Sequence, residues 1–302
     1  MRQEALLTVY ELAKANPKVL FIGSDLSEGT LAMMKQELPE QFLMEGISEQ
    51  HLIGFAAGLA KEGYIPFLNT IANFLTRRAL EQIILDVCLH KLPVKILASG
   101  GGMVYAPLGP THTAVDDLAH MLNIPELNVY APCDALEMTN LLKLEVDNPF
   151  PAYIRFGKGD EETVSNQLQD SEDNQFKLLG DKDSERVIVS TGVCLQPILE
   201  SLKLIPKENI PLIVHITKLN SFSPNLIKLL QRKKRVLVIE EHQEQGGLFT
   251  KLLHFYCSYG LDASTLKSIS LGFGYIRRYG SQIDHFKHNG ITPENISREL
   301  LK

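Results

Sequence analysis

Residues 45–67 read EGISEQHLIGFAAGLAKEGYIPF and place a helical pattern directly before a short apolar strand. Apolar residues recur at helical spacing over 51–61, and Glu49 stands at the start of this pattern. A carboxylate in such apolar, glycine-rich surroundings is costly to bury unless a hydrogen bond compensates. The alternative is a first-turn acid that interacts with the helix dipole. The stretch therefore predicts an α/β fold and a carboxylate whose partner comes from elsewhere.

Short apolar runs alternate with helical patterns along both halves of the chain, which is typical of mostly parallel sheets covered by helices on both faces. A polar, acidic stretch separates the halves. We therefore expect two three-layer α/β domains, at 1–160 and 185–302, joined by a linker at 161–184. The expected strands are 19–22, 66–68, 94–98, 128–131 and 152–156, then 187–190, 212–216 and 236–241.

The composition excludes several classes of function. The net charge of −6 opposes binding to a nucleic-acid backbone, and the one basic cluster, at 232–235, is interpreted as a helix end. Four separated cysteines without CxxC spacing indicate reduced thiols and no structural zinc. The amphipathic amino-terminal pattern predicts a surface helix, and no apolar run reaches the ~20 residues that span a bilayer. We expect a cytoplasmic protein without a nucleic-acid or membrane role.

A second motif, LGPTH at 108–112, places His112 in a loop that no periodic pattern explains. Loops on a rigid scaffold often carry function, although a structural hydrogen bond is the alternative for this imidazole. Phe74 lies where a strand ends and a helix begins, a place where α/β sheets bind ligands, with core packing as the alternative. The chain has neither GxGxxG nor a Walker motif, so the usual nucleotide cradles are missing.

These motifs resemble the pyrimidine-binding domain of thiamine-diphosphate enzymes, in the branch of transketolase and deoxyxylulose-phosphate synthase. The resemblance rests on residues 45–67, on NFLTRRALEQIILDVCLHKLPV at 73–94 and on GPTH, and it covers about residues 2–156. VIEEHQEQGGLFTKLL at 238–253 resembles the same family's carboxy-terminal domain. The resemblance implies two α/β domains and a thiamine-diphosphate-dependent transferase.

The resemblance also implies roles for particular residues. Glu49 matches the glutamate that hydrogen-bonds the cofactor's aminopyrimidine and activates the cofactor. Phe74 matches the aromatic residue that stacks on the pyrimidine, and His112 the histidine that contacts substrate oxygens. The remaining implied contacts are Asp25 and Ile71 for the cofactor, and Arg155 and Arg2 for a sugar phosphate.

One element of the family is missing. Its full-length members carry an amino-terminal domain in which a GDG motif holds a divalent metal against the diphosphate, and no GDG occurs in this chain. The resemblance therefore implies a separate amino-terminal subunit that carries GDG and binds Mg²⁺ or another divalent metal. The expected assembly is an α2β2 heterotetramer with sites at the subunit interfaces.

Two departures from the family concern the substrate. Leu108 replaces an aspartate that contacts a substrate hydroxyl, and Gly100 lies at or near a histidine that helps to bind the acceptor phosphate. A site with leucine loses discrimination for a hydroxyl, so we expect a branched, deoxy or otherwise modified sugar.

The leading hypothesis is the carboxy-terminal subunit of a split transketolase, which moves a two-carbon ketol unit from a ketose phosphate to an aldose. Three alternatives remain open. They are the β subunit of a 2-oxoacid dehydrogenase first component, an enzyme like deoxyxylulose-phosphate synthase, and a non-catalytic scaffold homologue.

Overall fold

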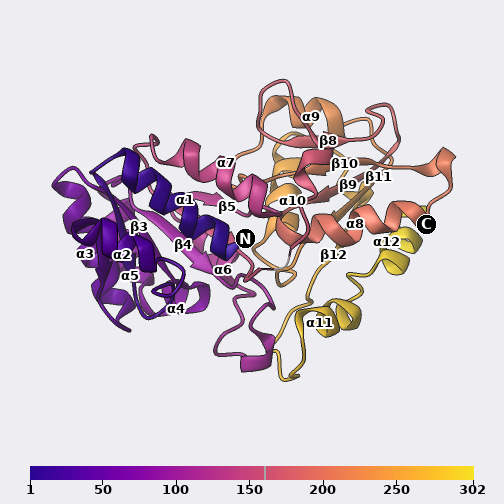
Figure 1. Cartoon of the computed structure of the whole chain (residues 1–302). Helices are drawn as coiled ribbons and strands as arrows, with labels where there is room; N and C mark the ends of the chain where they lie inside the picture. Colours follow the sequence, from indigo (N-terminus) through magenta and orange to yellow (C-terminus); the bar gives the residue numbers. More distant parts are fainter. Residues whose placement is uncertain (160) are drawn as a thin grey trace.

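The computed structural model describes residues 1–159 and 161–302, which form two α/β domains lying side by side (Figure 1). The first domain has a parallel sheet in the order β2-β1-β3-β4-β6-β5, and the second a mostly parallel sheet in the order β12-β11-β9-β10-β8-β7. The predicted fold class is confirmed. The strands are β1 (Val19–Gly23), β2 (Phe42–Met44), β3 (Ile65–Ile71), β4 (Lys95–Ser99), β5 (Asn128–Tyr130), β6 (Ala152–Phe156), β7 (Gln169–Asp170), β8 (Lys177–Leu179), β9 (Arg186–Ser190), β10 (Leu212–His215), β11 (Arg235–Ile239) and β12 (Leu266–Ile269).

Helices cover both faces of the first sheet because its central strands are buried on both sides. One layer contains α1 and α7, which pack against each other, together with α2. The opposite layer contains α3, α4 and the π-helix η2. The helices of this domain are α1 (Arg2–Ala15), α2 (Ala32–Glu37), η1 (Pro39–Gln41), α3 (Glu49–Lys61), α4 (Ala72–Arg78), α5 (Leu80–Gln82), η2 (Ile83–Cys88), η3 (Ala106–Leu108), α6 (Asp117–Met121) and α7 (Ala135–Glu145).

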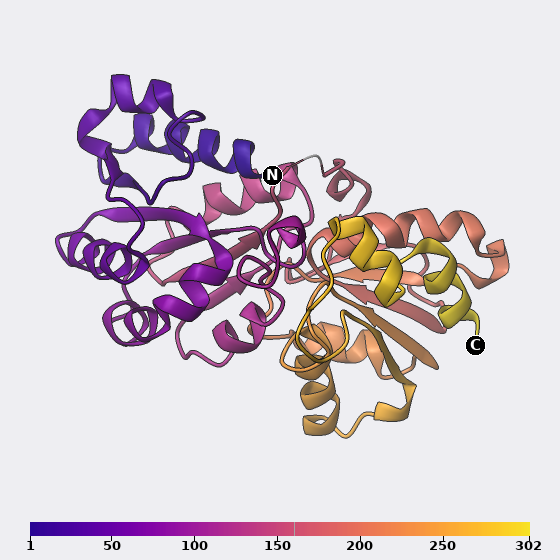
Figure 2. The same ribbon diagram turned by 90° about the horizontal axis from the view of Figure 1, so that it is seen from below.

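The second sheet is also a middle layer, with α10 on one face and α8 and α12 on the other (Figure 2). Buried leucines and isoleucines of these helices form the two cores beside the sheet. The helices are η4 (Ser165–Gln167), η5 (Gly192–Cys194), α8 (Leu195–Ser201), η6 (Leu202–Leu204), η7 (Lys207–Asn209), α9 (Pro224–Leu230), α10 (Leu248–Ser258), η8 (Ala263–Thr265), α11 (Gln282–Asn289) and α12 (Pro293–Leu301). Within the described residues, no helix combines the length and apolarity needed to cross a membrane.

The range 161–184, expected to be a linker, contains β7 and β8, which extend the second sheet: β8 pairs antiparallel with β10, and β7 pairs antiparallel with β8. Phe176 and Leu178 are buried in its core, whereas the neighbouring residues are polar and more exposed. Such a two-residue alternation marks a half-buried strand, and the acidic composition of the stretch concealed it. The second domain therefore begins earlier than predicted.

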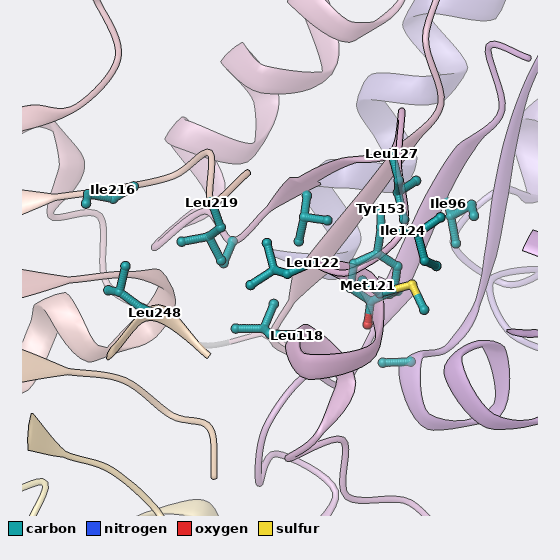
Figure 3. Close-up of a cluster of buried hydrophobic side chains, with 14 of the residues drawn as sticks. Ile96, Leu118, Met121, Leu122, Ile124, Leu127, Tyr153, Ile216, Leu219 and Leu248 are labelled. Carbon is teal, nitrogen blue, oxygen red and sulfur yellow. The ribbon is translucent and has the colours of Figure 1, made fainter. Parts of the chain in front are cut away.

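Apolar and backbone contacts join the two domains. Leu118 and Leu122 of the first domain belong to the same buried cluster as Leu219 and Leu248 of the second (Figure 3). The segment after β10 also runs along the edge strand β5, where the Leu219 amide donates to the carbonyl of Val129 at 2.9 Å. The domain boundary is therefore a continuous part of the core.

A buried ion pair lies at this boundary. His215 Nε2 is 3.1 Å from Glu137 Oε2, and the Thr217 hydroxyl donates to Glu137 Oε1 at 2.6 Å. Cys133 lies beside them, and one ligand-type atom of each of Cys133, Glu137 and His215 is within 4.8 Å of the others. Because both oxygens of Glu137 already accept hydrogen bonds, we interpret the group as a polar link between the domains.

Candidate active site

Polar side chains gather at the carboxyl ends of β1, β3 and β4. The hydroxyl oxygens of Ser24 and Thr70 lie 2.9 Å apart, and Asn69 Nδ2 donates to Ser99 Oγ at 3.0 Å. All four side chains are buried. The carboxyl ends of parallel strands are where open α/β sheets bind ligands, so this row marks the inner wall of the candidate site.

Glu49 lies at the first turn of α3 with only 4% of its surface exposed. Its Oε2 accepts from Arg78 Nη1 at 3.2 Å, whereas its Oε1 is buried and has no hydrogen-bond partner in the described part of the chain. A buried carboxylate oxygen without a donor costs about 1–3 kcal/mol. Arg78 thus supplies one partner from another helix, and a ring N–H or amino group would satisfy the second oxygen.

Phe74 and His112 lie close together. Their ring centroids are 5.1 Å apart at 66°, so the rings meet edge to face. The guanidinium carbon of Arg78 lies 3.8 Å from the centroid of Phe74. Arg78 therefore covers Phe74 and binds Glu49 at once, and this places Glu49, Phe74 and His112 along one line of contacts.

The segment 102–114, here called the His112 loop, is tied to α4 from two residues. Asn73 Nδ2 donates to the carbonyl of Thr111 at 2.8 Å, and Arg77 binds both carboxylate oxygens of Asp116, just after the loop, at 3.0 Å. The Thr111 hydroxyl lies 2.8 Å from His112 Nδ1. These contacts hold the His112 loop against α4.

A cationic group lies beside Tyr105 in the same loop. Arg2 Nη1 donates to the Tyr105 hydroxyl at 3.3 Å, and Lys158 Nζ lies 5.9 Å from the centroid of the ring. The ring occupies the space that a side chain at Gly100 would need, and Gly100 has a φ of +82°. A histidine at position 100 would therefore be strained and would collide with Tyr105.

Arg155, expected to bind a sugar phosphate, is buried at the domain boundary. Its Nε lies 2.9 Å from Asp117 Oδ2, and its Nη2 donates to the carbonyls of Ala114 at 3.1 Å and Glu241 at 2.7 Å. The side chain is 5% exposed, and Nη2 donates only to protein oxygens among the described residues. The structure therefore gives Arg155 an internal role and places it away from solvent.

The other predicted positions are distributed around the site. Asp25 follows β1, is exposed and accepts from the Ser24 hydroxyl at 2.8 Å. Ile71 ends β3 directly before α4. Leu108 is 56% exposed in η3, four residues before His112. Asp25, Ile71 and Leu108 thus belong to loops or strand ends at the carboxyl edge of the sheet.

Sequence reasoning missed three residues of this site: Asn73, Arg78 and Lys158. Arg78 follows Phe74 by four residues, the spacing that stacks side chains on one helix face, so this signal was available. Asn73 is buried, and its Oδ1 has no partner among the described residues. Lys158 is recognisable only from its place beside Tyr105.

A family model described as "Transketolase, pyrimidine binding domain" matches residues 1–162. A putative transketolase C-terminal section of Methanocaldococcus jannaschii is 30% identical over 300 residues, covering 98% of this chain and 93% of that protein. The chain belongs to the transketolase family. The resemblance inferred from the motifs is thereby confirmed.

Two further relatives of this transketolase-family chain differ in length. A subunit of the apulose-4-phosphate transketolase of Phocaeicola vulgatus is 30% identical, and the alignment covers 98% of this chain and 94% of that relative. A 1-deoxy-D-xylulose-5-phosphate synthase of Dictyoglomus turgidum is 34% identical over 79% of this chain, but over only 39% of the synthase. This chain therefore spans about two fifths of that longer relative.

Solved structures agree with the family assignment. A split-gene transketolase, described as an inactive beta4 tetramer, superposes with a TM-score of 0.85 at 28% identity, covering 99% of this chain and 96% of that one. The transketolase of Campylobacter jejuni gives 0.80 at 16% identity over 46% of its length, which supports the fold alone. The transketolase-family fold thus extends over both domains.

Proposed function

We propose that this chain is the carboxy-terminal subunit of a split, thiamine-diphosphate-dependent transketolase that moves a two-carbon ketol unit from a ketose phosphate to an aldose. The observation that carries the proposal is Glu49, a buried carboxylate with one unpartnered oxygen among the described residues, in line with Phe74 and His112. Such a carboxylate is costly without a ligand, and a protonated or N–H-bearing ring nitrogen would satisfy it.

The residues present fit the cofactor. Glu49 Oε1 would accept from the aminopyrimidine, and the face of Phe74 that Arg78 now covers would stack on the ring. Arg78 is half exposed, so its guanidinium can withdraw towards solvent at little cost. Bound thiamine diphosphate supplies the nucleophilic carbon that attacks a ketose carbonyl. Glu49 tunes that chemistry by holding charge and a proton at the pyrimidine.

His112 would act on the substrate. With the Thr111 hydroxyl at Nδ1, the ring presents Nε2 to a substrate oxygen and can donate or accept a proton there. Arg2 and Lys158 would bind the phosphate, because both cations lie beside Tyr105, at the base of the same loop. We assign them this role in place of Arg155, whose side chain is buried and whose Nη2 donates to two backbone carbonyls.

The other half of the site would come from a partner chain. No GDG motif occurs in this sequence, so we propose an amino-terminal subunit that carries it and binds the diphosphate through Mg²⁺ or another divalent metal. Large apolar side chains are exposed around α3 and η2: Ile47 is 66% exposed, Leu85 47% and Leu89 69%. Apolar surface beside an incomplete site suits a subunit interface, and two copies of each chain give an α2β2 assembly.

The substrate would be an unusual sugar. Leu108 is exposed near His112 and cannot bond a hydroxyl through its side chain. Tyr105 fills the place beside Gly100 where the family has a histidine. A branched, deoxy or otherwise modified donor or acceptor fits these two changes.

The test is to express this chain with and without a partner that contains GDG, and to measure thiamine diphosphate binding by calorimetry with Mg²⁺. Tight binding in the mixture only, lost in Glu49→Ala but kept in the matched exposed variant Glu62→Ala, supports the proposal. Turnover is then screened with ketose phosphates and, separately, with pyruvate and glyceraldehyde 3-phosphate.

The pyruvate arm tests the synthase-like alternative, which the 34% identity to a deoxyxylulose-phosphate synthase favours. Condensation of pyruvate without ketol transfer would replace the transketolase assignment. Absence of cofactor binding in the mixture would refute both activities and favour a scaffold role.

A further inference from the structure

The second domain contacts the His112 loop at its base. There the loop closes on itself, since the Gly102 amide donates to the carbonyl of Ala114 at 2.8 Å and the Ala114 amide returns a bond at 3.1 Å. Residues 240–243 follow β11 and lie against this closure. The amide of Gln243 donates to the carbonyl of Val115 at 2.8 Å.

Glu241 makes the central contact. Its Oε1 accepts from the backbone N–H of Met103 at 2.8 Å and from Gln282 Nε2 at 2.7 Å, and the residue is 3% exposed. Its carboxylate fills the space in which a side chain at Gly102 would stand, and Gly102 has a φ of +73°. Only glycine therefore allows the loop to approach this carboxylate.

The backbone of Glu241 reaches the other side of the loop through Arg155. Nη2 of Arg155 donates to the carbonyls of Glu241 at 2.7 Å and Ala114 at 3.1 Å, and the stem of Arg155 packs on Gly101. Asp117 holds the guanidinium from the other side at 2.9 Å. Both ends of the loop are thus connected to one residue of the second domain.

Placing a carboxylate in the buried space beside Gly102 costs desolvation free energy. Burial raises the pKa of Glu241 to about 7, against the opposing effect of the Arg155 charge. An apolar residue of similar volume would avoid that desolvation, but it would leave the Met103 N–H without an acceptor. Glu240, its neighbour, is equally buried, but it accepts from the amides of Leu248 and Phe249 within its own domain. Of the two adjacent carboxylates, one caps a helix and the other binds the loop.

We propose that Glu241 is a positioning residue, which sets the place of His112 by holding Gly102 and Met103 from the second domain. The expected effect of Glu241 on turnover rests on the proposed function. Its effect on the position of the His112 loop rests on the hydrogen bonds alone. It gives the second domain a task within the site beyond subunit contact.

The test compares hydrogen exchange and kinetics. Glu241→Asp shortens the side chain by one methylene, so exchange of amides 103–112 should rise about tenfold while exchange in α3 stays unchanged. In the complex with the partner chain, kcat should fall about tenfold with KM and cofactor affinity unchanged, since a small misplacement of a reacting group costs rate. Glu241→Gln keeps an acceptor for the Met103 N–H, so its exchange of amides 103–112 and its kcat should stay close to those of the unmodified chain.

Glu240→Gln is the matched control and should raise exchange in α10 only. Equal exchange of 103–112 in Glu241→Asp and the unmodified chain overturns the proposal, as does a uniform rise over the whole chain. If Glu241→Asp does not fold, Gln282→Ala replaces it, because this variant removes a hydrogen bond to the Glu241 carboxylate. Unchanged hydrogen exchange of amides 103–112 in Gln282→Ala would then overturn the proposal. Loop exchange that responds while no ketol transfer occurs would refute the proposed function and leave the positioning contact standing.

Discussion

Replacing Glu49 by methionine should make the free chain more stable, by about 1 kcal/mol in the free energy of unfolding. Glu49 is 4% exposed, and its Oε1 has no donor within the described residues. Methionine fills a similar volume and has a similar helix propensity, so the change removes the polar cost without opening a cavity. If Glu49 serves a ligand and not the fold, its replacement should raise the free energy of unfolding of the free chain.

The magnitude follows from three contributions. Removing an unsatisfied buried acceptor gains about 1–3 kcal/mol. Losing the bond to Arg78, whose side chain is 51% exposed, costs about 0–1 kcal/mol. Losing a negative charge in the first turn of α3 costs about 0.3–1 kcal/mol through the helix dipole. The central values leave a net gain near 1 kcal/mol.

Urea unfolding of the free chain measures this change, and Glu145→Met is the matched control. Glu145 is 3% exposed on α7, but it accepts from Tyr130 at 2.6 Å and lies 3.4 Å from the fully buried ammonium of Lys95. Its replacement strands that charge and should cost about 3–5 kcal/mol. If Glu49→Met destabilised the chain as Glu145→Met does, Glu49 would be an ordinary structural carboxylate and the reasoning would fail.

Two further predictions concern pH and substrate. Burial alone would raise the pKa of Glu137, but His215 and the hydrogen bonds that Glu137 accepts lower this pKa to about 2. A carboxylate whose pKa is lowered in the folded state stabilises the fold at pH values above its unfolded pKa of 4.5. This stabilisation is lost as the pH falls towards the folded pKa of about 2. The stability difference between the native chain and Glu137→Gln, up to roughly 3 kcal/mol, should therefore shrink between pH 5 and pH 3 in urea titrations; a difference independent of pH would contradict the ion pair. Leu108→Asp should improve kcat/KM for an ordinary ketose phosphate about tenfold or more, because the side chain regains an acceptor for a hydroxyl. Unchanged selectivity in competition assays with the reconstituted complex would exclude Leu108 from substrate recognition.

Continuous apolar runs allowed most of the strands to be predicted. β1, β4, β6, β9 and β11 are buried along almost their whole length, and such strands are visible in sequence as unbroken hydrophobic residues. β2, β7, β8 and β12 were missed because they are short or only half buried. β2, β8 and β12 also pair with strands elsewhere in the chain, which no local pattern records.

The residues of the candidate site also fall into two groups: those that a local sequence pattern indicates and those that depend on distant contacts. The isolation of Glu49 was visible locally because a carboxylate interrupts an apolar and glycine-rich stretch. The burial of Arg155 was not, since it depends on Asp117, which is 38 positions away. Glu240 and Glu241 end the expected strand 236–241, and both are buried. Their carboxylates accept hydrogen bonds from backbone amides and from Gln282, and such bonds compensate for burial.

The edge strand β5 carries one more consequence. Its outer hydrogen-bonding groups are taken by residues 217–220, since the Ala131 amide donates to Thr217 at 2.9 Å and the Leu219 amide to Val129 at 2.9 Å. Without the second domain, these groups would form a bare strand edge, which templates association with other chains. The first domain would be prone to aggregate during synthesis until residues 217–220 had emerged and docked. Solubility of the nascent protein thus depends on a segment more than eighty residues downstream of the strand that it protects.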